Sequence, residues 1–182
     1  MQGTYACLLR YLTAVGSIAL ALAIPTTAMA DLITPKLPGV TGEVTVEGQQ
    51  GTIEVLSLSG NVQEPVTGSA GGSRARSLPV FSDLMIDKRL DSSSLALFLE
   101  LFRASLLRSG VITFLRTGQG GFTKFFTLTL TNVSLTRFQI DDSENDVLAG
   151  HEQINLNYER IELKDEVTGQ TACWNIPEAT AC

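Results

Sequence analysis

The chain has 182 residues, of which 13 are basic and 19 acidic, so its formal net charge is −6 at neutral pH. This acidic balance disfavours binding to nucleic acid or to anionic lipid, whose phosphates would repel the chain. Hydrophobic residues make up 44% of the sequence, which suits one globular domain with a sizeable buried core and leaves no length for a second full domain.

Residues 1–30 have the pattern of a secretory signal peptide. Arg10 supplies the positive n-region, residues 11–24 form an almost uncharged apolar stretch, and residues 28–30 form the small-x-small cleavage site Ala-Met-Ala. A membrane anchor is the alternative, but the apolar run of about fourteen residues is shorter than the roughly twenty needed to span a bilayer. We therefore expect a secreted or periplasmic protein that has no membrane contact once the leader is removed.

Short runs of alternating apolar and polar residues dominate the rest of the chain, and a period of two is typical of half-buried β-strands. The expected strands cover residues 44–46, 52–58, 111–115, 122–130, 134–140 and 154–163. A Gly-rich segment at residues 117–121 separates two of these runs and predicts a β-hairpin. The alternation changes phase at Val55-Leu56, which indicates a β-bulge of the kind that curls a sheet into a barrel.

Residues 91–107 instead carry apolar side chains at helical spacing. Asp91 or one of the three serines that follow it can cap the helix. One set of apolar residues comprises Leu95, Phe98, Leu99, Phe102 and Leu106, and a different face carries Leu97 and Leu101. An isolated surface helix is rarely apolar on two faces, so we expect this helix either to be deeply buried or to meet a neighbouring subunit, with Leu97 and Leu101 as candidate contact residues.

Two further segments have distinctive compositions. Residues 68–76 form a Gly- and Ser-rich stretch with Arg74 and Arg76, which predicts an exposed loop whose two cations could meet acidic residues of another subunit. Residues 168–182 are expected to be a C-terminal tail that contains Cys173 and Cys182. In an oxidising compartment this pair predicts a disulfide worth about 2–3 kcal/mol, and two free thiols are the alternative.

No arrangement typical of an enzyme or a metal site stands out, so we expect no catalytic residues, no bound metal and no cofactor. His151 is the only histidine, and we interpret it as a solvated or packed imidazole. The acidic segment at residues 141–146 superficially resembles a calcium loop but lacks the Gly and the terminal Glu of an EF-hand. A pair of carboxylates able to hydrolyse a glycoside is not excluded, but no pair is singled out.

The order of these elements, together with several local motifs, resembles the haemolysin-coregulated protein (Hcp) family, the tube proteins of type VI secretion systems. The motifs are Gly-Thr-Ile-Glu-Val-Leu-Ser-Leu-Ser at residues 51–59, Asp-Ser-Ser-Ser-Leu at 91–95, and Glu-Gln-Ile-Asn-Leu-Asn-Tyr-Glu-Arg-Ile at 152–161. The resemblance implies a small antiparallel β-barrel over residues 31–167, flanked by one α-helix. It also implies six copies in a ring, rings stacked into a hollow tube, and effector proteins carried in the lumen, with no catalytic residues.

Two other functions remain open at this stage. The chain could be an exported, stand-alone binding module on the same barrel, outside any contractile apparatus. It could also be a hydrolase that uses scattered carboxylates, which would require two facing carboxylates in a pocket. The resemblance favours a ring-forming structural protein over both.

The signal-peptide interpretation predicts cleavage after Ala30, so that the mature chain begins at Asp31. The rival is translation from Met29, which would give a protein without a leader. Mass spectrometry of protein from the native host separates the two, because an N-terminus at Met29 would rule out export by this leader.

Overall fold

The computed structural model describes residues 31–67, 75–103, 106–118, 120–141 and 150–182. The predicted signal peptide, Arg74, and residues 142–146 of the acidic segment therefore lie outside the described residues. The elements of the described part, in chain order, are β1 (Leu32–Lys36), β2 (Ser57–Ser59), β3 (Val62–Gln63), β4 (Val66–Thr67), β5 (Ala75–Arg76), β6 (Val80–Phe81), β7 (Leu84–Arg89), α1 (Ser94–Arg103), β8 (Leu107–Gly118), β9 (Gly121–Asp141), β10 (His151–Asn157), β11 (Arg160–Asp165), β12 (Thr171–Asn175) and β13 (Thr180–Ala181).

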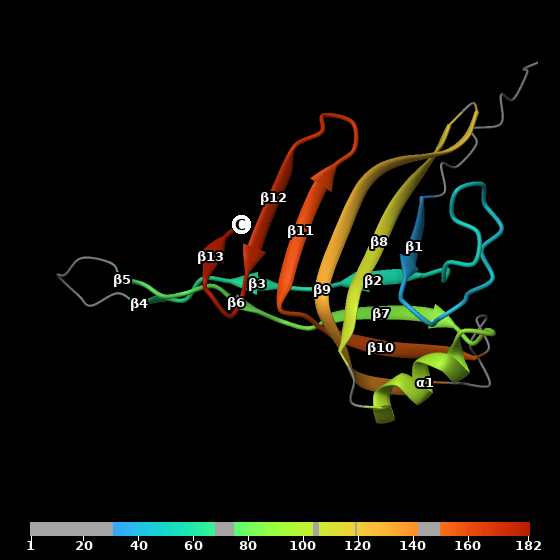
Figure 1. Cartoon of the computed structure of the whole chain (residues 1–182), viewed down its shortest axis with the longest axis horizontal. Coiled ribbons are helices and arrows are strands. Elements are labelled where there is room, and N and C mark those ends of the chain that lie inside the picture. The colour runs from blue at the N-terminus through green and yellow to red at the C-terminus, as the bar shows by residue number, and fades with distance from the viewer. Residues whose placement is uncertain (1–30, 68–74, 104–105, 119, 142–149) are drawn as a thin grey trace, which may run out of the picture.

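The described chain is mainly antiparallel β-structure with one helix, which confirms the predicted fold class (Figure 1). The strand order is β13-β12-β11-β9-β10-β7-β2, and β8 pairs with both β1 and β9. The sheet is strongly curled, with α1 packed beside the β9–β10–β7 part of it. An isolated bridge between Ile33 and Val55 links the first strand to the segment that leads into β2.

The 21-residue strand β9 holds the two halves of the sheet together. Residues 126–131 of β9 pair with β11, whereas residues 134–141 pair with β10. Asn132 lies between these segments with a φ of 53°, a left-handed conformation that asparagine tolerates better than most residues. The prediction of two separate strands at 122–130 and 134–140 is therefore wrong, because the chain bends at Asn132 without leaving the sheet.

Three other predictions about the strands need correction. Residues 44–46 form no strand, since Gly42 lies so close to Thr52 that the segment folds back as an irregular hairpin, with the Val44 amide donating to the Thr52 carbonyl. The run at 154–163 divides into β10 and β11. The C-terminal tail is not a separate appendage, because β12 pairs with β11 over five residues and extends the main sheet.

A fully buried ion pair lies where α1 meets the sheet. Lys88 continues the inward-facing positions of Leu84 and Ile86 on β7, and its side chain is 0% exposed. Its Nζ donates to Glu152 Oε1 at 2.6 Å, directly opposite in the β7–β10 register, and to Asp91 Oδ1 at 2.8 Å. The same Asp91 oxygen accepts the Ser93 amide at 2.8 Å, just before α1 begins. One ammonium therefore joins two strands to the start of the helix.

Replacing Lys88 by methionine should lower the free energy of unfolding by about 3–5 kcal/mol, because it leaves the buried Glu152 and the partly buried Asp91 without their cation. Adding Glu152→Leu should recover part of that loss. Lys164→Met is the control, since its partly exposed ion pair with Glu166 at 2.8 Å is screened by solvent and should contribute much less. Urea denaturation measures all three, and an equal loss from Lys88→Met and Lys164→Met would contradict the assignment.

The pH dependence follows from the same contacts. Burial alone would raise the pKa of Asp91, but hydrogen bonds from Lys88 and Ser93 and the Lys88 charge outweigh it and lower that pKa from its usual 3.8. Because the folded pKa lies below the unfolded one, this stabilisation is complete above the unfolded pKa and is lost as the pH falls through the folded value.

Candidate functional site

A polar face covers the outer side of β2, β7 and β10. Ser57 donates to Asp87 at 2.5 Å, and Gln153 donates to the same carboxylate at 3.1 Å, which forms a ladder across three strands. Gln139 of β9 stands opposite Gln153 in the register and adds a further polar side chain to this face. This polar face results from strand alternation, because the neighbouring residues Ile86, Ile154 and Leu156 point into the core.

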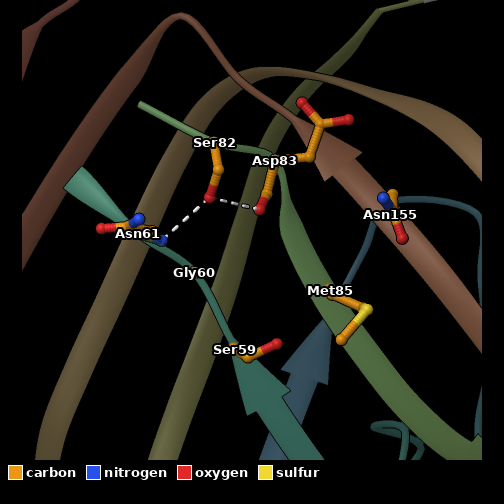
Figure 2. Close-up of a pocket in the computed structure, with 7 residues that line it drawn as sticks. All are labelled: Ser59, Gly60, Asn61, Ser82, Asp83, Met85 and Asn155. Atoms are coloured by element: carbon orange, nitrogen blue, oxygen red, sulfur yellow. Dashed lines mark hydrogen bonds between the residues drawn. The ribbon is translucent and has the colours of Figure 1, made fainter. Parts of the chain in front are cut away.

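A pocket of about 490 Å³ opens on this polar face, where β2 ends and β7 begins. Figure 2 shows its seven lining residues: Ser59, Gly60, Asn61, Ser82, Asp83, Met85 and Asn155. Ser82 Oγ accepts the Asn61 amide at 2.8 Å and donates to the Asp83 carbonyl at 3.0 Å, so it ties the two walls together (Figure 2). The Asn155 Oδ1 atom is buried and has no hydrogen-bond partner.

Asp83 is the one carboxylate of the pocket lining, and its oxygens are already engaged. Oδ2 accepts Thr136 Oγ1 at 2.5 Å, and Oδ1 accepts Asn157 Nδ2 at 2.8 Å. A general acid or base needs a reachable proton partner and usually a second titratable group, and the pocket lining supplies neither a histidine nor a second carboxylate. The pocket therefore suits recognition of a hydrogen-bond donor better than catalysis.

The helix presents an apolar surface to solvent, which we call the α1 patch and define as Leu95, Phe98, Leu99 and Phe102. Their exposed fractions are 76%, 43%, 51% and 67%. Phe98 also packs edge-on against two other rings. Its ring centroid lies 4.9 Å from that of Phe102 and 5.4 Å from that of Phe138 on β9. The α1 patch is thus a continuous surface anchored on the sheet.

The two leucines predicted to contact another subunit lie elsewhere on α1. Leu97 is 0% exposed and belongs to the core of its own chain, so its prediction as a subunit contact is wrong. Leu101 is half-buried against the same core. Helical periodicity identified two apolar faces, and the buried contacts of Lys88 turn the Leu97 face inward.

An arm projects from the main sheet between β2 and β7 (Figure 1). It consists of two short ladders, β3 with β6 and β4 with β5, and it carries exposed apolar side chains at Val62, Leu78 and Val80. Arg76, predicted as a contact residue, ends β5. Phe81 of β6 packs against the core, but the exposed apolar side chains give this extended hairpin the form of an element that contacts a neighbour.

The remaining predicted residues lie on two different parts of the sheet, the cysteines on β12 and just after β13 and the histidine on β10. Cys173 and Cys182 are joined by a disulfide with their Cα atoms 5.3 Å apart. His151 begins β10 with its Nε2 atom buried and unpartnered. In the described part of the chain, no three His, Cys, Asp or Glu side chains are placed to hold a metal ion, and no helix is long and apolar enough to cross a membrane.

Comparisons with known proteins agree on one family. A family model described as "Type VI secretion system effector, Hcp" matches residues 35–164. Among solved structures, Hcp1 from Salmonella typhimurium is 20% identical with a TM-score of 0.69, and the match covers 84% of this chain and 100% of that one. Hcp1 from E. coli EAEC 042, in a doubly substituted form, is 21% identical with a TM-score of 0.69, covering 82% and 99%. Secreted protein Hcp3 from Pseudomonas aeruginosa is 18% identical with a TM-score of 0.61, covering 81% and 98%. No curated sequence matches the chain.

The pocket geometry makes a prediction about Tyr158, whose hydroxyl donates to the Ser82 carbonyl at 3.3 Å. Burial raises the pKa of Tyr158 above its usual 10.0, and the nearby Asp83 charge raises it further. Asp83→Asn should therefore lower the Tyr158 pKa without returning it to 10.0, because the burial remains. Ultraviolet titration of tyrosinate measures this change, and Asp87→Asn, further along the chain on β7, is the control that should leave it unmoved.

Proposed function

We propose that this chain, which belongs to the Hcp family of type VI secretion systems, is a structural subunit that closes into a homo-oligomeric ring, most simply a hexamer. Members of this family form ring oligomers and are secreted. Stacked rings would form a hollow tube that carries effector proteins in its lumen. The subunit performs no catalysis in this role. Export through the predicted leader would deliver it to the periplasm or the medium.

The α1 patch is the observation that carries this proposal. Four large apolar side chains on one ten-residue helix are unusual on the surface of a protein that stays monomeric. Fully burying an exposed side chain of this size contributes about 1.5–3 kcal/mol, and burying the exposed part of each of these four against another copy would contribute a share in proportion to its exposed fraction. The α1 patch therefore replaces Leu97 as the proposed subunit contact, with the half-buried Leu101 at its margin.

The polar face suits the inner wall of such a tube. Ser57, Asp87 and Gln153 form a hydrated ladder that a water-filled channel would leave in contact with solvent. An apolar wall would instead bind unfolded or hydrophobic cargo non-specifically. We assign the α1 patch to contacts between subunits and the polar face to the lumen.

The net negative charge of each copy opposes assembly, and the arginines of the arm can offset this repulsion. Each copy is net acidic, by −6 for the full chain and one unit more after Arg10 is removed with the leader. Repulsion between six such copies is screened within about 8–10 Å at ordinary salt, but reaches about 30 Å at 0.01 M. Arg76 of β5 and Arg74, two residues before it in the sequence, are the cations we propose to meet acidic residues of the next subunit or the next ring.

A stand-alone binding module is the second candidate, and the pocket of about 490 Å³ is the observation that favours it. In that case the protein would remain monomeric, and the buried Asn155 Oδ1 would accept a hydrogen bond from the ligand. The oligomeric state separates the two functions.

Light scattering of residues 31–182 should show an oligomer that dissociates as the salt concentration falls, because the copies repel one another. Leu99→Glu or Phe102→Glu should weaken association by about 10- to 100-fold, which corresponds to one lost apolar contact. Arg74→Glu should make the remaining association more sensitive to low salt.

Val167→Glu is the matched control, since Val167 is a 78% exposed apolar residue in the β11–β12 turn, away from the α1 patch. It should leave the oligomer intact. A wild-type protein that stays monomeric at high concentration and high salt would defeat the ring and favour the binding module.

A further inference from the structure

The last strand of the sheet depends on the disulfide. Strand β13 makes only two register pairs with β12, Trp174 with Ala181 and Asn175 with Thr180. The Cys182 amide adds one hydrogen bond to the Cys173 carbonyl at 3.3 Å. Strands this short are not stable by themselves, so the covalent bond between Cys173 and Cys182 holds β13 in place.

Strand β12 beneath it has none of the usual protections of a sheet edge. Its sequence, Thr-Ala-Cys-Trp-Asn, contains no charge and no proline. The neighbouring strand β11, Arg-Ile-Glu-Leu-Lys-Asp, alternates charges and would resist pairing with another chain. An uncharged edge strand is a template for a further strand, and natural proteins normally cover or charge such an edge. Here β13 covers it.

Opening the disulfide would leave β12 in position. Strand β12 keeps five register pairs with β11, and Trp174 and Ile176 remain packed against the core. The turn between the two strands is held separately, because the Asp165 carboxylate accepts the amides of Val167 and Thr168 at 2.8 and 3.0 Å. Loss of β13 would therefore expose an ordered edge.

The exposed edge is complementary to itself. Cys173 is the central residue of β12, so a second copy of β12 in antiparallel pairing would place its own Cys173 directly opposite. In the oxidised chain Cys182 lies opposite Cys173, one register step beyond the Trp174–Ala181 pair. The Cα atoms of Cys173 and Cys182 are 5.3 Å apart. Hydrogen-bonded antiparallel pairs have the same spacing, about 5.5 Å, which lies within the range that a disulfide spans.

We propose that the Cys173–Cys182 disulfide is a latch over a strand-pairing surface whose partner is a second copy of this chain. A dithiol reductant opens the latch: its thiolate attacks the exposed Cys182 sulfur, the Cys173–Cys182 bond breaks, and the reductant leaves as a disulfide after both cysteines have gained protons. Two copies then pair through β12. While the disulfide is intact, β13 covers β12, so copies can contact one another only through other surfaces.

Cross-linking tests this proposal without depending on ring formation. Denaturing, non-reducing electrophoresis dissociates non-covalent rings but keeps disulfide-linked dimers intact. Cys182→Ser leaves Cys173 on the uncovered edge. With a small disulfide oxidant that is reduced to two thiols, it should form a Cys173–Cys173 linked dimer. Cys173→Ser, which leaves Cys182 at the chain end, is the control for random collision, and we expect the first variant to react about ten-fold faster because its cysteines are held together.

A second variant separates edge pairing from unfolding. Ala172 is exposed on β12, so Ala172→Lys in the Cys182→Ser background should return the cross-linking rate to the level of the control, whereas Val167→Lys in the turn should not. Hydrogen exchange on wild-type protein with the dithiol, at a concentration too low for two copies to pair, should deprotect the outward amides of Cys173 and Asn175 and spare those of Ala172 and Trp174, which face β11; at high concentration the pairing should protect Cys173 and Asn175 again. Equal cross-linking in the two single-cysteine variants, or general deprotection of β12, would overturn the proposal.

Discussion

The orientation of the helix depends on the buried ammonium of Lys88. The side chain is fully excluded from water, and its charge is stabilised by hydrogen bonds to Glu152 and Asp91 at 2.6 and 2.8 Å and to the Arg89 carbonyl at 2.7 Å. Asp91 in turn binds the Ser93 amide at the helix start, so the strand register and the helix entry are fixed by the same charge. Leu97 is then directed into the core, and the α1 patch remains outside.

This arrangement separates three surfaces with different chemistry. The α1 patch is apolar, the outer side of β2, β7 and β10 is polar and hydrogen-bonded, and the arm projects beyond the sheet (Figure 1). A structural subunit needs this separation, because contacts between copies are stabilised by apolar burial, whereas a channel wall must stay hydrated. The pocket lining has one carboxylate, Asp83, which already accepts hydrogen bonds from Thr136 and Asn157.

The fold class could be predicted from the sequence because alternation over several strands and one helical segment are strong local signals. The family resemblance rested on the same segments. Strand β1 was missed, since Leu32–Lys36 is short and contains Pro35, and it is stabilised by pairing with the distant β8. Local periodicity carries no information about such a partner.

The site was harder to predict than the fold. Periodicity placed Leu97 on one helix face and Phe98 on another, but both faces are apolar, and tertiary contacts decide which one is buried: the packing of Leu97 in the core and the contacts of Lys88 at the helix start. A signal for those contacts existed in the sequence, because Lys88 follows Leu84 and Ile86 at the inward-facing positions of β7. A charged residue at such a position indicates a buried ion pair.

Electron microscopy of purified residues 31–182 at moderate ionic strength tests the central claim most directly. The account predicts closed rings of uniform diameter with six-fold symmetry in top views, and some stacked rings in side views. A field of single particles of monomer size, at a concentration well above that used for the light scattering, would contradict it.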